Sequence, residues 1–204
     1  MELNPHDLLE IESAKELTSL SDIPEWVKSS IAEAPFVVVR RARASEGWIA
    51  VGIRGKERNE RFAAFVPVDR ILRRITPEQL TRERKWNGKS KEIFRGLEEI
   101  GKVLDYHSLE WGPTGSIGFE LASGKETTKK TSDIDIVIRF SKNFTLNFAR
   151  MIEAELKNNQ FRVDIQIETS EGAFLLNEYL ASGEKPILLR TVDGPRLKNI
   201  VIKE

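Results

Sequence analysis

Two aspartates separated by one residue, Asp133 and Asp135, are the side chains in this sequence best suited to catalysis. They open the segment 133–140 (DIDIVIRF), whose alternation of polar and apolar residues predicts a β-strand. Side chains at positions i and i+2 of a strand point to one face, so the two carboxylates would converge. Close carboxylates repel each other unless a cation lies between them, and oxygen ligands of this kind suit Mg²⁺. The spacing alone is also consistent with a sheet whose outward face happens to be acidic.

A third carboxylate, Asp164, lies in a later alternating segment, 161–167 (FRVDIQI). Arg162, Asp164 and Gln166 would share one face of that strand and the apolar residues the other. If the strand lies beside the first in a sheet, Asp164 completes a cluster of three carboxylates. Such clusters hold the divalent ions that bridge attacking and leaving oxygens in phosphoryl transfer. A lone aspartate in a strand is more often simply solvent-facing.

A glycine-rich turn precedes these carboxylates at 112–118 (GPTGSIG). Glycines allow backbone amides to approach phosphate oxygens closely, which makes Gly115 and Ser116 candidates for binding phosphate. A helix that starts near Ser116 would add the partial positive charge of its N-terminus at the same point. Glycine turns before helices are common, so this motif gains weight only beside the carboxylates.

The segments around these residues indicate an α+β fold in two domains. Residues 1–85 predict a small β-rich domain, with strand patterns at 36–42, 48–54 and 61–68 and a short helix from Pro77. The polar run 82–91 is the expected linker. Residues 90–204 predict a catalytic domain with a mixed sheet, in which helices at 93–104, 146–156 and 173–180 alternate with strands at 109–112, 133–140, 161–167 and 186–190.

The composition of the 204 residues is that of a globular protein, with 40% hydrophobic and 31% charged residues. The absence of cysteine excludes disulfides and thiolate metal sites. No run approaches the roughly 18 to 20 apolar residues of a membrane span, and the first residues do not resemble a secretory signal. These features lead us to expect a cytoplasmic protein.

Basic residues are concentrated in the middle of the chain. Residues 41–90 carry thirteen basic and six acidic side chains, whereas the chain as a whole is balanced at 32 of each. Three arginines of this stretch, Arg54, Arg58 and Arg61, lie beside the glycine turn at Gly55 and are candidates for binding an anionic substrate or an acidic protein. A solvated strand edge without a special partner explains them equally well.

The joint pattern of a Gly-Ser turn, an apolar-flanked Asp-x-Asp and an aspartate in a later strand is more specific than its parts. It resembles the nucleotidyltransferase superfamily related to DNA polymerase β, over roughly residues 105–170. Within that superfamily, the segment 111–139 (WGPTGSIGFELASGKETTKKTSDIDIVIR) is similar to the phosphoribosyl-dephospho-CoA transferases of malonate decarboxylase, also called malonate decarboxylase holo-[acyl-carrier-protein] synthases. The likeness continues at 5–9 (PHDLL), at 51–55 (VGIRG) with Arg58 and Arg61, and at 75–78 (ITPE).

The resemblance implies a polymerase-β-like catalytic domain and a specific reaction. Members of that family attach 2′-(5″-phosphoribosyl)-3′-dephospho-CoA to a serine of the apo acyl-carrier protein of malonate decarboxylase. Their donor is the 5″-triphosphoribosyl form, and pyrophosphate leaves. Asp133 and Asp135 match the family's catalytic aspartates, and Gly115-Ser116 match its Gly-Ser turn. Pro113 departs from the pattern, at a position that does not touch the chemistry.

For this chain the resemblance predicts Mg²⁺ held by Asp133 and Asp135, with Asp164 as a further metal ligand or as the base for the serine proton. The Gly115-Ser116 turn would hold the donor's β- and γ-phosphates. Neither nucleic acid nor a membrane is an expected partner. Three alternatives remain open at this point: a citrate lyase carrier, an ordinary nucleoside triphosphate as donor, and a non-catalytic binding module of the same fold.

Overall fold

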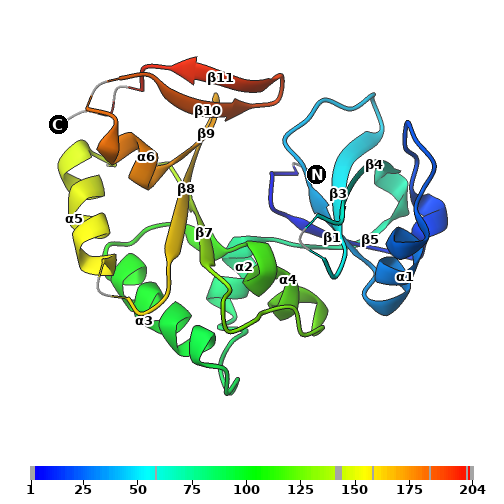
Figure 1. The fold of residues 1–204 in the computed structure, drawn as a ribbon, viewed down its shortest axis with the longest axis horizontal. Helices are drawn as coiled ribbons and strands as arrows, with labels where there is room; N and C mark the ends of the chain where they lie inside the picture. Colours follow the sequence, from blue (N-terminus) through cyan, green and yellow to red (C-terminus); the bar gives the residue numbers. More distant parts are fainter. Residues whose placement is uncertain are drawn as a thin grey trace. The chain divides into compact units, whose positions relative to one another are not determined.

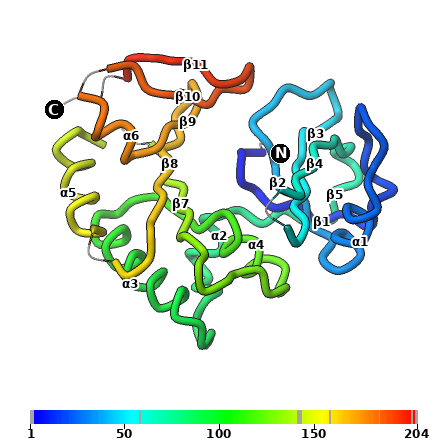
Figure 2. Tube along the Cα trace, viewed as in Figure 1, coloured from blue at the N-terminus to red at the C-terminus, as the bar shows by residue number. Residues whose placement is uncertain are grey.

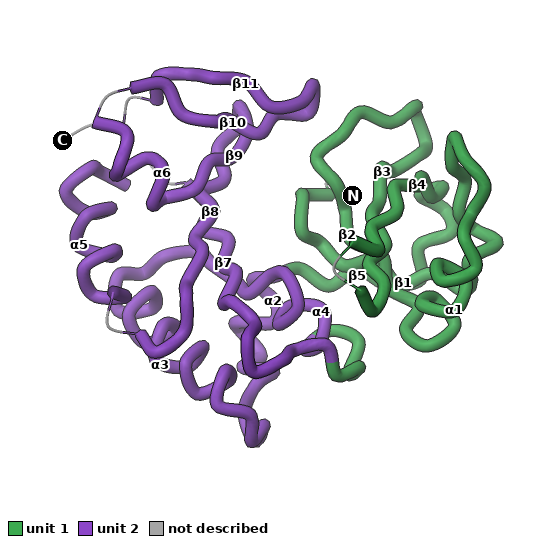
Figure 3. Tube along the Cα trace, in the orientation of Figure 1, with its two compact units in different colours: residues 1–76, 122–126 green, residues 77–121, 127–204 purple. Residues whose placement is uncertain are grey.

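The computed structural model describes residues 3–57, 59–140, 144–157, 159–183, 185–200 and 202. The chain divides into two compact units, residues 1–76 with 122–126, and residues 77–121 with 127–204 (Figure 3). The first is β-rich and the second combines helices with a mixed sheet, which confirms the predicted α+β class. None of the helices in the described ranges has the length and apolar character needed to cross a bilayer.

The first unit is built on a five-stranded antiparallel sheet in the order β4-β3-β2-β1-β5 (Figure 1). Its elements are β1 (Leu8–Ile11), η1 (Ala14–Glu16), α1 (Glu25–Glu33), β2 (Phe36–Val39), β3 (Trp48–Arg54), β4 (Arg61–Pro67), η2 (Val68–Arg70) and β5 (Ile71–Ile75). Helix α1 buries Val27 and Ile31 against alternate strand residues such as Leu9, Val37 and Val51. Burial of this one apolar face stabilises the sheet.

A buried ion pair joins the start of β1 to the edge strand β5. The Asp7 carboxylate, which precedes β1, has no exposed surface, and Arg74 of β5 donates from Nε to its Oδ2 at 2.8 Å. The same oxygen accepts the backbone N–H of Asn4 at 2.8 Å. A buried charge costs free energy unless it is paired, so this carboxylate depends on Arg74.

The second unit is built on a six-stranded sheet in the order β11-β10-β9-β8-β7-β6. Its strands are β6 (Trp111–Pro113), β7 (Ile134–Arg139), β8 (Val163–Thr169), β9 (Gly172–Leu175), β10 (Ile187–Thr191) and β11 (Gly194–Lys198). Its helices are α2 (Pro77–Arg82), α3 (Glu92–Tyr106), α4 (Gly115–Ser123), α5 (Leu146–Leu156) and α6 (Leu176–Ala181). Strands β7 and β8 are parallel, because helix α5 carries the chain back between them (Figure 2). The other neighbouring pairs in the described part of this sheet are antiparallel.

The two faces of β7 and β8 differ in chemistry, as their alternation predicts. Ile134, Ile136 and Ile138 are buried on the face that packs against α3, where Gly96 leaves room for the side chains of Ile134 and Phe161. The buried isoleucines of β7 thus pack the sheet against its helices. The odd-numbered residues, Asp135 among them, therefore lie on the opposite face.

The polar run 82–91 differs from the expected linker, because it belongs to the second unit and the division falls at Thr76. Trp86 is buried and donates from Nε1 to Glu98 of α3 at 2.7 Å, and Arg84 pairs with Asp105. The helix predicted at 173–180 is also corrected in part. Its first residues form β9, which pairs with β8, and only Leu176–Ala181 is helical.

We expect Arg74→Ala to lower the free energy of unfolding by about 3–5 kcal/mol, because it leaves the Asp7 carboxylate buried without its partner. The matched control is Arg73→Ala, which removes the exposed pair with Glu10 (2.8 Å) from the same strand. That change should cost less than about 1 kcal/mol. Urea denaturation of both variants measures the difference, and equal losses would contradict the role given to Asp7.

Candidate functional site

Asp135 and Asp164 lie directly opposite each other on adjacent parallel strands. The register of β7 and β8 pairs these two residues, within a run that extends from Ile134 with Val163 to Arg139 with Glu168. Neighbouring strands are about 4.8 Å apart, so side chains in register on one face are close neighbours. Both carboxylates are half-buried. The sheet therefore holds two negative charges together on the face away from α3.

Asp133 directly precedes β7 and is also half-buried. The next residue, Ile134, donates its N–H to the Arg162 carbonyl at 2.9 Å, which ties this end of β7 to β8. Within the part of the chain that the structure describes, no three His, Cys, Asp or Glu side chains are grouped so as to hold a metal ion. A metal site formed by Asp133, Asp135 and Asp164 therefore stays a prediction.

Gly115 and Ser116 form the start of α4 and lie against β7. Gly115 has a φ of +57°, and a Cβ at this position would overlap Oδ2 of Asp135. The N–H of the preceding residue, Thr114, donates to the Asp135 carbonyl at 2.8 Å. Only a residue without a side chain allows the first turn of α4 so near the carboxylate. The positive end of a helix thus meets the acidic face of the sheet.

Asp164 is bound by Arg162, which directly precedes the same strand. Arg162 donates from Nε to Oδ1 at 3.2 Å and approaches Oδ2 with Nη2 at 3.1 Å. The two side chains share a face because they are two residues apart. A carboxylate offers about four lone-pair positions, so the pair leaves about half of them for another ligand. The donor set on this face remains all oxygen, which fits Mg²⁺.

A buried carboxylate that the sequence reasoning missed, Glu120, fixes the segment leading to Asp133. Glu120 lies on α4 and is only 2% exposed. Its Oε2 accepts the N–H groups of Thr127 at 2.9 Å and Thr128 at 2.8 Å, and the Thr128 hydroxyl at 2.7 Å. Lys91 completes the set, with Nζ 2.9 Å from Oε1. The same segment is held to the start of α4, because the Thr127 hydroxyl donates to the Ser116 carbonyl at 2.8 Å.

The environment of Glu120 favours its charged form. Burial by itself raises the pKa of this carboxyl, but hydrogen bonds from the Thr128 N–H, from Lys91, from the Thr128 hydroxyl and from the Thr127 N–H outweigh it and lower the pKa to about 2. The carboxylate is therefore ionised near neutral pH. In the sequence, the only sign of this role is a glutamate among the apolar residues of α4, and that position does not reveal which residues bind it.

The candidate arginines of the first unit lie at the ends of a hairpin. Arg54 of β3 is paired in register with Arg61 of β4, and both side chains are exposed. Neither forms a salt bridge with any residue in the described ranges. Like charges directly opposite on a sheet are unfavourable, which makes this pair receptive to an anion. Arg58 lies outside the described residues.

The comparisons with known proteins account for nearly the whole chain. The family model "Phosphoribosyl-dephospho-CoA transferase MdcG N-terminal domain" matches residues 4–77, and the corresponding C-terminal domain model matches residues 79–200. The chain belongs to the phosphoribosyl-dephospho-CoA transferase family. Its membership identifies it as an enzyme of the transferase class.

Individual phosphoribosyl-dephospho-CoA transferases agree with this assignment. That of Azotobacter vinelandii is 38% identical over 197 residues, which cover 95% of this chain and 91% of the relative. Those of Pseudomonas fluorescens (strain Pf0-1) and Pseudomonas putida are each 37% identical, over 90% and 95% of this chain and 87% and 92% of their own lengths. No solved structure gives a significant match.

The lowered pKa of Glu120 predicts a pH-dependent contribution to stability. Because the folded-state pKa lies below the unfolded value of about 4.3, the contribution is fully present above pH 4.3 and is lost as the pH falls towards 2. Glu120→Gln should therefore lower the free energy of unfolding by up to about 3 kcal/mol at pH 7. At pH 3 the difference in free energy of unfolding between Glu120→Gln and the wild type should be less than half of its value at pH 7.

Urea denaturation at the two pH values measures this gap, with Glu99→Gln on the exposed side of α3 as the control. The control should behave as the wild type at both pH values. A Glu120→Gln deficit of the same size at pH 3 and pH 7 would show that the charge of Glu120 does not stabilise the fold.

Proposed function

We propose that this transferase moves 2′-(5″-phosphoribosyl)-3′-dephospho-CoA from its 5″-triphosphoribosyl donor to a serine of the apo acyl-carrier subunit of malonate decarboxylase, with release of pyrophosphate. The observation that carries the proposal is the placement of Asp135 in register with Asp164 and against the Gly115 turn. This arrangement places an acidic face beside the N-terminus of a helix, which suits metal-assisted transfer from a triphosphate donor with pyrophosphate as the leaving group. The family assignment supports the donor class.

In the proposed reaction the carrier serine oxygen attacks the α-phosphorus of the donor in line. A new P–O bond forms to the serine, the bond to the bridging oxygen of the β-phosphate breaks, and pyrophosphate leaves with that electron pair. We assign the β- and γ-phosphates to the N–H groups of Gly115 and Ser116 at the start of α4. Asp164 is either a further metal ligand or the base that accepts the serine proton.

Asp133 and Asp135 are the residues we assign to Mg²⁺, with Asp164 as the third. The fit rests on the all-oxygen donor set and on the in-register placement of Asp135 and Asp164. When bound, the ion supplies positive charge that offsets the charge on the transferring phosphoryl group. A cytoplasmic location, expected from a chain without cysteine, belongs to the same proposal.

The direct test is to incubate the protein with the donor, Mg²⁺ and the apo carrier of malonate decarboxylase, and to follow carrier mass and pyrophosphate release. A parallel reaction with the apo carrier of citrate lyase tests the choice of acceptor. We expect the malonate decarboxylase carrier alone to gain the mass of the prosthetic group. Modification of the citrate lyase carrier instead would correct the acceptor, and no modification of either would reject the proposal.

We expect Asp133→Asn and Asp135→Asn each to lower kcat by about 100-fold or more, since loss of a metal ligand removes several kcal/mol of charge stabilisation. Thermal denaturation checks that the fold is retained. Asp22→Asn, an exposed position of the first unit, is the control and should keep full activity. Normal turnover by either active-site variant would remove that residue from the mechanism.

We also expect Arg54→Ala and Arg61→Ala to raise KM for the donor or for the carrier by up to about fivefold, which corresponds to the ~1 kcal/mol of one exposed ion contact. Added salt should shrink the difference, because it screens exposed charges. The substrate whose KM moves identifies the ligand. Lys28→Ala, which removes an exposed cation of α1, is the control. Unchanged KM values at low salt would leave these arginines as solvated side chains.

A further inference from the structure

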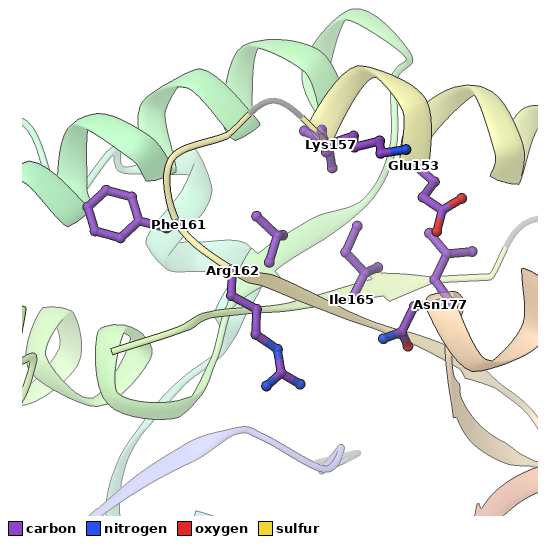
Figure 4. A pocket seen from close by; sticks show the side chains of 9 residues that line it. Glu153, Lys157, Phe161, Arg162, Ile165 and Asn177 are labelled. Carbon is purple, nitrogen blue, oxygen red and sulfur yellow. The ribbon is translucent and has the colours of Figure 1, made fainter. Parts of the chain in front are cut away.

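A cavity of about 300 Å³ opens beside the first half of β8, next to the proposed site (Figure 4). Its walls come from the end of α5, the start of β8 and the start of α6. Five of the nine lining residues are apolar and four are polar or charged. They are Leu156, Phe161, Val163, Ile165 and Leu176, with Glu153, Lys157, Arg162 and Asn177.

The cavity lies where the edge of β8 is uncovered. Strand β9 pairs with β8 only from Gln166 to Thr169, because the chain leaves the sheet after Leu175 to form α6. The Arg162 carbonyl points to β7, where it accepts the Ile134 N–H at 2.9 Å. Backbone groups alternate along a strand, so those of Val163 and Ile165 point to the opposite edge. The register with β9 ends at Gln166 opposite Leu175, a pairing that engages the Ile165 carbonyl, so among the described residues the uncovered part of this edge is at Val163.

An apolar groove with free backbone donors and acceptors along one wall suits a narrow flexible chain that carries amide groups. The amides can hydrogen-bond to the strand edge as a short additional strand would, while the methylene and methyl groups contact the apolar wall. A stable protein contact needs about 1,000 Å² of buried surface, more than a hollow of this size provides. The cavity therefore fits part of a small molecule better than it fits a carrier protein.

We propose that this cavity binds the pantetheine arm of the dephospho-CoA donor, with an amide at the uncovered edge of β8 at Val163 and the methyl and methylene groups against Ile165 and its apolar neighbours. The inference rests on the proposed function for the identity of the donor. Pantetheine has two amides, a branched dimethyl group and short methylene runs, which match the two kinds of wall. Val163 and Ile165 flank Asp164 in the sequence but face the helices, so the cavity and the carboxylates lie on opposite faces of β8. A donor that reaches both passes round the uncovered edge of the strand at Val163.

Arg162 connects the cavity to the carboxylate face. Figure 4 shows Ile165 pointing towards α5, whereas the Arg162 side chain extends from the other side of β8. Its contacts with Asp164 use Nε and Nη2, and its side chain is 68% exposed. The remaining N–H groups of the guanidinium are available for the diphosphate that joins the arm to the adenosine.

The test compares two ligands that differ by the pantetheine arm, dephospho-CoA and ADP, by calorimetry. Asn177→Trp places an indole in the wall of the cavity, and Ala181→Trp, at the exposed end of the same helix, is the matched control. We expect Asn177→Trp to weaken dephospho-CoA binding at least tenfold and to leave ADP binding unchanged. The control should bind both ligands as the wild type does.

Hydrogen exchange of the unmodified protein gives a second measurement that depends on no substitution. Dephospho-CoA, but not ADP, should slow exchange in the peptide that contains Val163 and Ile165. Equal dephospho-CoA binding by wild type and Asn177→Trp, or equal exchange with both ligands, would overturn the inference. Carrier modification is measured in parallel. If the carrier is modified but neither the binding nor the exchange effect is seen, the proposed function stands and the inference about the cavity is wrong. If both effects are seen but the carrier is not modified, the cavity binds the arm and the proposed reaction is rejected.

Discussion

The parallel pairing of β7 with β8 is the constraint on which the proposed site depends. It places Asp135 opposite Asp164, and a shift of one residue would turn one of them towards α3. The register is enforced from the other face, where Ile134, Ile136 and Ile138 are fully buried. Apolar packing thus overcomes the repulsion between two adjacent carboxylates, and the first turn of α4 brings compensating positive charge.

Around that pair the enzyme uses charged groups in two different ways. Glu120 is buried, and its carboxylate accepts hydrogen bonds from Thr127, Thr128 and Lys91 that fix the segment before β7. Asp164 is held more openly, by an arginine that is itself mostly exposed. The first arrangement gives rigidity to the segment that enters β7. The second leaves the proposed reaction face able to exchange partners when a polyanionic substrate arrives.

The strands of the proposed site were predictable because polar and apolar residues alternate along them, as in 133–140 and 161–167, and because burial of one face fixes the orientation of the other. The turn at Gly115 was recognisable as a motif, but its contact with Asp135 was not. Strand β5 was missed because two of its five residues are arginines, one of which serves a buried partner, Asp7. The role of Glu120 depends on residues that are distant along the chain, which no local pattern reveals.

The helical crossover through α5 also determines when the site can form during synthesis. Gly115, Asp135 and Asp164 lie in three successive segments, and the last pairing joins residues 29 positions apart. Parallel pairs require closure of such long loops, whereas the hairpin of β3 and β4 closes locally. Folding in chain order therefore completes the first unit's sheet well before the carboxylates meet. A nascent chain that stops short of β8 therefore contains every strand of the first unit's sheet but lacks one of the three carboxylates of the proposed site.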